Sequence, residues 1–148
     1  MAVRFLVALA LGAIIGLERE LVGKEAGIRT AMLVSSGAAM FAMIALALPY
    51  IVAVSPENLP QVVATNGGFL IVIANIVVGI GFLGAGIIIK NDGSHVHGMT
   101  TAAVIWTTAA VGTFAGIGLM TFAVFSALVI SGLLYVLRNV KVNNQSFS

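Results

Sequence analysis

The sequence predicts an all-α membrane protein, folded as a compact bundle of five transmembrane helices. Composition carries this prediction: of 148 residues, 60% are hydrophobic and 8% are charged, and the mean hydropathy is +1.14. A soluble domain has about 25% charged residues, and a small one needs them to cover a surface that is large for its volume. We therefore expect one domain whose surface is mostly in contact with lipid, with no separate soluble domain.

Apolar runs place the five helices at about residues 3–18, 30–48, 65–89, 100–116 and 119–137. A spanning helix needs roughly 20 mostly apolar residues. The first run is short and reaches that length only if Arg4 and Glu18 lie at the two membrane surfaces. The last two share an uncharged stretch about two spans long, which we expect to fold at the "GIGL" of residues 116–119. Helices four and five should therefore form a tight hairpin.

Basic residues predict the orientation of these helices. Arg4 is the one basic residue expected on its side of the membrane, and six are expected on the opposite side: Arg19, Lys24, Arg29, Lys90, Arg138 and Lys141. Since Lys and Arg near span ends favour the cytoplasm, the amino terminus should lie outside and the carboxyl terminus in the cytoplasm. The alternative, that the first run is a cleaved signal peptide, would leave an even number of spans.

Small residues predict where helices approach each other closely. Lipid gives helices little hydrophobic reason to associate, so contact depends on small side chains that let backbones meet. Gly12 and Gly16 follow Ala8 at four-residue spacing on the first helix, and Gly112 and Gly116 repeat this spacing on the fourth. The pattern indicates either packing within the subunit, which we favour, or a dimer.

The stretch "VGIGFLGAG" (78–86) matches the dinucleotide-binding pattern G-x-G-x-x-G. That motif requires a preceding strand and an acidic residue about 20 residues further on, and this chain has an apolar membrane run before it and "AAVIWTT" after it. In a helix, Gly79 and Gly86 would share one face, with Gly81 and Gly84 roughly opposite. We favour a third helix that packs on both faces over a helix that breaks to face a polar cavity. Substitution of Gly81 or Gly84 by Leu should then disrupt packing.

Polar residues in or beside the spans are the candidates for function, since they are costly in lipid. Asn75 lies one turn before Gly79, and it could bond a neighbouring helix or line a solute site. Glu18, Glu20 and Arg29 could form a salt-bridged lock against the loop that contains Asp92. Alternatively, Glu18 and Glu20 could bind Mg²⁺, which prefers one or two carboxylates. The chain has no cysteine and no recognisable catalytic set, so we expect neither an enzyme nor a cofactor.

Three motifs, "IGLERELVGKEAGIRTAML" (15–33), "GIGFLGAGIIIK" (79–90) and "HGMTTAAVIWTTAAVGTFAGIG" (97–118), together resemble the transmembrane domain of the MgtC/SapB family. The resemblance covers roughly residues 3–137. It implies a multi-pass protein of the bacterial inner membrane, in a family with members linked to growth in low magnesium, survival inside phagocytes and control of the ATP synthase. The signature positions it implies are Glu18, Arg19, Glu20, Ala26, Gly27, Arg29, Thr30, Gly79, Gly81, Gly84, Gly86, Gly98, Thr100 and Thr101.

This chain departs from the family pattern at two places. Many members have charged residues before the third helix and Gln where Asn75 stands, and some have a cytosolic regulatory domain after the spans. The resemblance favours a regulatory or interaction protein that acts in low magnesium or stress, as a homo-oligomer (a dimer is favoured) or with another membrane protein. The alternative is a small ion or solute transporter with a path near Asn75. The candidate functional cluster is Glu18, Arg19, Glu20, Arg29, Thr30, Asn75 and Asp92, and no nucleic-acid partner is expected.

Overall fold

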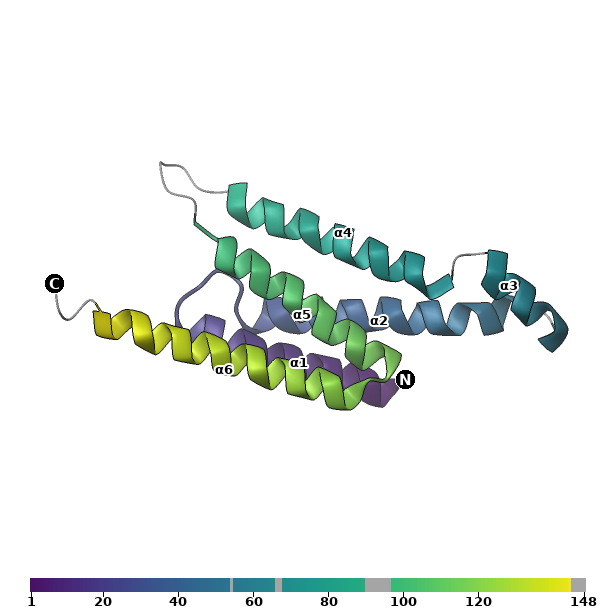
Figure 1. Ribbon diagram of the computed structural model, residues 1–148, viewed down its shortest axis with the longest axis horizontal. Coiled ribbons are helices and arrows are strands. Elements are labelled where there is room, and N and C mark those ends of the chain that lie inside the picture. Colours follow the sequence, from purple (N-terminus) through teal and green to yellow (C-terminus); the bar gives the residue numbers. More distant parts are fainter. Residues whose placement is uncertain (54, 66–67, 90–96, 145–148) are drawn as a thin grey trace.

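The computed structural model describes residues 1–53, 55–65, 68–89 and 97–144, and this part of the chain is all-helical. In chain order the elements are α1 (Ala2–Leu21), α2 (Ile28–Val52), η1 (Pro56–Asn58), α3 (Leu59–Thr65), α4 (Gly68–Ile89), α5 (Met99–Ile117) and α6 (Met120–Asn144). The long helices run along the length of the molecule, with α5 beside α4 and the short α3 at the far end of α2 (Figure 1). The prediction of an all-α bundle is confirmed.

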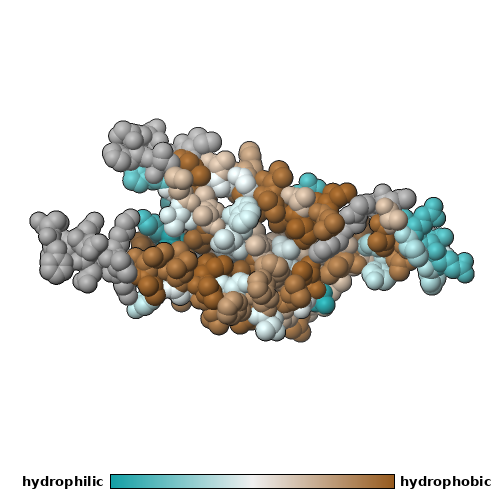
Figure 2. All heavy atoms as spheres, viewed as in Figure 1, coloured by the Kyte–Doolittle hydropathy of each residue, from teal (hydrophilic) through white to brown (hydrophobic). Residues whose placement is uncertain are grey.

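In the part of the chain that the structure describes, four helices are long and apolar enough to cross a membrane: α2, the Leu70–Ile88 part of α4, α5, and the Met120–Arg138 part of α6. The first predicted span forms α1, a helix of 20 residues that contains Arg4, Glu18, Arg19 and Glu20. Its charges lie at its two ends, and its middle packs against α2, α5 and α6. Hydrophobic residues cover most of the middle of the face in Figure 2, and hydrophilic residues gather toward its ends. The protein is therefore a helical membrane protein.

The predicted boundaries of the first and third spans differ from the structure, and the predicted hairpin is confirmed. The helix α1 continues to Leu21, beyond the predicted end of the first span at Glu18. The third predicted span, 65–89, corresponds to α4, which continues without interruption from Gly68 to Ile89, so its glycines do not break it. The short helix α3 precedes it. The predicted hairpin is present: α5 ends at Ile117, and Gly118 takes a left-handed conformation (φ +99°) that turns the chain into α6.

The closest helix contacts occur at the glycines of α1 and α5. A Cβ on Gly12 would lie 2.5 Å from the Ala31 carbonyl oxygen of α2, and one on Gly116 would lie 2.6 Å from that of Ala39. Gly112 lies against the backbone of Ser35, whose hydroxyl donates a 2.7 Å hydrogen bond to the Ala8 carbonyl of α1. Helices α1, α2 and α5 therefore meet around Ser35, and the small-residue pattern serves packing within the subunit.

The glycines of α4 behave differently. A Cβ on Gly84 would lie in ordinary contact with Ala102 of α5, at 3.5 Å, whereas one on Gly79, Gly81 or Gly86 would meet nothing within 4 Å. Among the α4 residues whose burial the structure describes, Gly84 is the one that is buried. Within the subunit α4 therefore contacts α5 at Gly84, and packing against Gly79, Gly81 and Gly86 stays a prediction.

Arg4, at the opposite end of α1 from the acidic residues, has a structural role. Its guanidinium donates a 3.0 Å hydrogen bond to the Gly116 carbonyl, in the last turn of α5. Carbonyls in the last turn of a helix have no partner within the helix, and a cation there also interacts favourably with the helix dipole. The charge that we used as a marker of topology therefore also fastens α5 to α1.

Candidate functional site

The charged residues at the end of α1 form a buried ion pair. Glu18 and Arg19 are 7% and 6% exposed, and Arg19 Nε donates to Glu18 Oε2 at 2.5 Å. The second carboxylate oxygen, Oε1, is buried and has no hydrogen-bond partner. Neighbouring residues on a helix usually point in different directions, so sequence spacing gave no signal of this pair. The charge of the buried Glu18 carboxylate is therefore balanced by one group, the Arg19 guanidinium.

Glu20, two residues after Glu18, has a different contact. Its Oε2 accepts a 2.8 Å hydrogen bond from the backbone N–H of Ile28, the first residue of α2. The first N–H groups of a helix lack partners within the helix, and a carboxylate there is favoured by the helix dipole. Gly27 makes the approach possible, because a Cβ at that position would lie 2.6 Å from the same Glu20 oxygen. The motif "ERELVGKEAGIR" therefore encodes a cap that joins the end of α1 to the start of α2.

We expect Glu20→Ala to lower the free energy of unfolding by about 1 kcal/mol, since removal of a side-chain cap usually costs about that much. Thermal unfolding of the protein in detergent micelles would measure the change. Glu25→Ala removes an exposed carboxylate from the same turn and should leave the unfolding temperature unchanged. Equal losses from the two substitutions would show that net charge, and not the cap, is what matters.

The remaining members of the candidate cluster do not join this pair. Arg29 is exposed, and its side chain makes no ion pair or hydrogen bond within the described residues; Thr30 is half-buried. Asp92 lies outside the described residues, and so does any contact between its loop and Glu18, Glu20 or Arg29. Glu18 pairs with Arg19, and the contact of Glu18, Glu20 and Arg29 with the loop that contains Asp92 stays a prediction.

Glu18 and Glu20 were also the candidates for a magnesium site. In the structure the carboxylate of one is buried against Arg19, and that of the other is exposed and bonded to the Ile28 N–H. Within the part of the chain that the structure describes, no three His, Asp or Glu residues come close enough to hold a metal ion. The two carboxylates are therefore engaged separately, by groups of the protein itself.

Asn75 lies apart from the charged cluster, on α4. It lines an apolar groove of about 460 Å³ between α2 and α4, together with Gly37 and Phe41 of α2 and Gly79 of α4. The Asn75 side chain is exposed and makes no hydrogen bond within the described residues. The groove contains no charged residue, so it brings Asn75 near small and apolar neighbours and not near Glu20.

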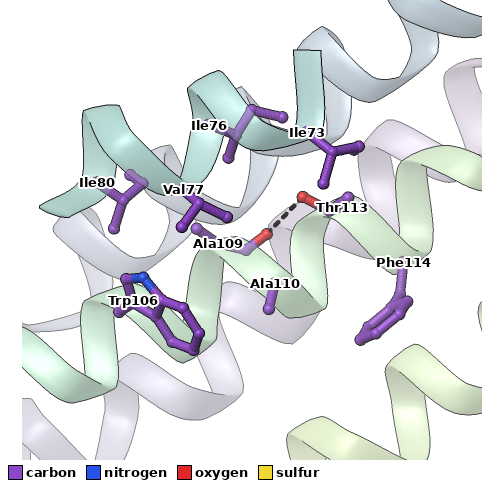
Figure 3. Close-up of a pocket in the computed structure, with 9 residues that line it drawn as sticks. All are labelled: Ile73, Ile76, Val77, Ile80, Trp106, Ala109, Ala110, Thr113 and Phe114. Atoms are coloured by element: carbon purple, nitrogen blue, oxygen red, sulfur yellow. Dashed lines mark hydrogen bonds between the residues drawn. The ribbon is translucent and has the colours of Figure 1, made fainter. Parts of the chain in front are cut away.

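A second, smaller cavity of about 150 Å³ separates α4 from α5. Isoleucine and valine side chains of α4 point across it toward α5, where Trp106 lies near one end of the labelled group and Phe114 near the other (Figure 3). Its one hydroxyl, from Thr113, donates to the Ala109 carbonyl of its own helix at 2.9 Å. The lining therefore offers a solute almost no free polar group.

The bundle of apolar helices, with a buried ion pair at the end of α1 and an exposed amide within α4, defines a multi-pass helical membrane protein. The MgtC family model matches residues 5–143, and the chain belongs to the MgtC family. It is 41% identical over 131 residues to Protein MgtC of Brucella abortus, covering 88% of this chain and 48% of that protein. It is 37% identical over 125 residues to Protein MgtC of Salmonella typhimurium, covering 84% and 47%.

An uncharacterized protein of Synechocystis is similarly related, at 39% identity over 127 residues, covering 86% of this chain and 47% of that protein. The chain therefore spans about half the length of the curated relatives it matches. No solved structure matches it.

Proposed function

We propose that this protein is a non-enzymatic component of the bacterial inner membrane that supports adaptation to low magnesium or stress by binding other membrane proteins, including copies of itself. The carboxyl terminus faces the cytoplasm in this proposal. The observation that carries the interaction role is the Asn75 amide, which is exposed on α4 and has no hydrogen-bond partner among the described residues. A polar group in that position favours a protein contact, since lipid tails offer it no partner.

The engagement of the charged residues also supports interaction over transport. A path for an ion through the bilayer is lined by polar groups or by water. The two cavities beside α4 contain no charged residue, and Glu18 and Glu20 are bonded to Arg19 and to the Ile28 N–H. A transporter with a path near Asn75 and a charged cytoplasmic gate is the alternative function. Transport of this kind would require the Glu18–Arg19 and Glu20–Ile28 contacts to break.

Two measurements together test the proposal. Purified protein in liposomes should move no Mg²⁺ above the rate of empty vesicles, and a bacterium that lacks the gene should grow more slowly than its parent only when magnesium is scarce. Complementation by the wild-type chain should restore growth, and Asn75→Leu should restore it less well because the contact is weakened. Magnesium flux that Asn75→Leu abolishes in a folded protein would replace the interaction role with transport.

A further inference from the structure

The outer face of α4 carries a polar group in an apolar surface. Asn75 lies five residues inside the apolar Leu70–Ile88 stretch, about 8 Å from its start at 1.5 Å per residue. Several hydroxyl groups elsewhere in the spans donate to carbonyls of their own helices, as Thr107 does to Ala103 and Ser126 to Phe122. The Asn75 amide has no such bond in the described residues. In a hydrocarbon environment an unpaired amide is costly, so this face needs a partner that can form hydrogen bonds.

The residues beside Asn75 leave room for another helix. At about 100° per residue, Gly79 and Gly86 lie within about 40° of Asn75 around the helix axis, and neither has a neighbour within 4 Å of where its Cβ would be. Gly37 of α2, across the groove from Gly79, is equally open. Glycines at this spacing allow two helix backbones to approach closely in a membrane. At Gly12, Gly112 and Gly116, by contrast, the space beside the glycine is occupied by another helix of the same subunit.

We propose that the face formed by Asn75, Gly79 and Gly86, with the adjoining α2–α4 groove, is the contact surface for a second copy of this chain. A side-chain amide has both donors and an acceptor. Two copies related by a two-fold axis place the same patch against itself, so each Asn75 amide can bond to the other. A lipid tail fills the groove without satisfying the amide. This inference deepens the proposed function, because it names the surface through which the protein binds its own copy.

Two glycines of α4 provide a matched test. Gly79 and Gly81 are two residues apart, each has open space around it in the subunit, and they point to nearly opposite faces of the helix. Gly79→Leu should abolish the dimer by blocking backbone approach, whereas Gly81→Leu should dimerise like the wild type. Light scattering of the full chain in mild detergent, and photobleaching steps of labelled protein in vesicles, would measure the dimer fraction.

The amide is tested separately from the glycines. Asn75→Leu should weaken the dimer about 3- to 30-fold, the range expected for loss of hydrogen bonding between membrane helices. Asn75→Gln retains the amide and should dimerise close to wild type. Because the chain has no cysteine, Phe82→Cys on this face should form an intermolecular disulfide on oxidation, while Leu128→Cys on α6 should not; both positions are exposed in the subunit.

A monomeric wild-type chain, a Gly79→Leu variant that dimerises normally, or equal cross-linking at the two cysteine positions would each overturn this interface. Those results would leave the proposed function intact if the gene still restored growth in low magnesium. Conversely, a dimer through α4 in a strain whose growth does not depend on the gene would support the interface and contradict the proposed function. A dimer that survives Asn75→Leu at full strength would remove the amide from the interface.

Discussion

Gly112→Ala should destabilise the protein by at least about 3 kcal/mol, the upper end of the usual cost of overpacking. The added Cβ would overlap the carbonyl oxygen and carbonyl carbon of Ser35, which are backbone atoms. Ser35 is fully buried and also bonds to the Ala8 carbonyl. A flexible side chain could move aside, but here α2 would have to shift away from both α1 and α5, because it contacts both helices at this residue.

Unfolding in mixed micelles, followed by the fluorescence of Trp106, the chain's one tryptophan, would measure this loss. Gly132→Ala is the matched control. Gly132 lies in α6 with nothing within 4 Å of its would-be Cβ, so the methyl group should leave stability unchanged or slightly raised, given the better helix propensity of Ala. If Gly112→Ala unfolds at the same denaturant concentration as Gly132→Ala, α2 and α5 do not meet at this point.

The second large effect is expected from Arg19→Gln, which should cost about 3–5 kcal/mol of unfolding free energy. This is the typical penalty when one partner of a buried ion pair is removed and the other charge stays buried. The penalty should be high here, because one oxygen of Glu18 already lacks a hydrogen bond and Arg19 is the partner of the other. The same micelle unfolding assay measures it.

The double substitution Glu18→Gln with Arg19→Gln should recover part of this loss, since it leaves no buried charge, and a double-mutant cycle gives the coupling between the two side chains. Arg29→Gln is the control for net charge. Arg29 is exposed and unpaired in the described residues, so its loss should change stability by less than about 0.5 kcal/mol. A cost for Arg19→Gln as small as that of Arg29→Gln would mean that the pair is not buried in the membrane-embedded protein.

The glycine patterns show how far spacing alone can predict contacts. Repeats at four residues correctly predicted that α1 and α5 approach other helices closely, because a residue without a side chain permits such approach wherever a helix lies next to it. The same reasoning finds no described neighbour for Gly81 on α4 within one subunit. Whether a neighbour lies beside a given helix face depends on the arrangement of the whole bundle, and in the subunit that face has none.

The charged motif shows the same division at the level of single side chains. The sequence indicated that Glu18, Glu20 and Arg29 lie at one end of the helices, because charges are excluded from apolar spans. It did not indicate which atoms they contact. The structure pairs Glu18 with the adjacent Arg19 and uses Glu20 to cap α2, since those contacts depend on how α1 ends and on where the turn places Gly27.

By itself, the sequence determined that the chain is a helical membrane protein, where most of its helices lie, and that α5 and α6 form a hairpin. Hydrophobic run length and charge are local properties, and lipid permits few alternatives to helices. Only the tertiary structure decided that α1 stays helical through its acidic end and buries Glu18 there, that Ser35 joins three helices, and that α4 stays at the edge with Asn75 exposed. Those outcomes depend on which helices are neighbours, a property that no local pattern in the chain contains.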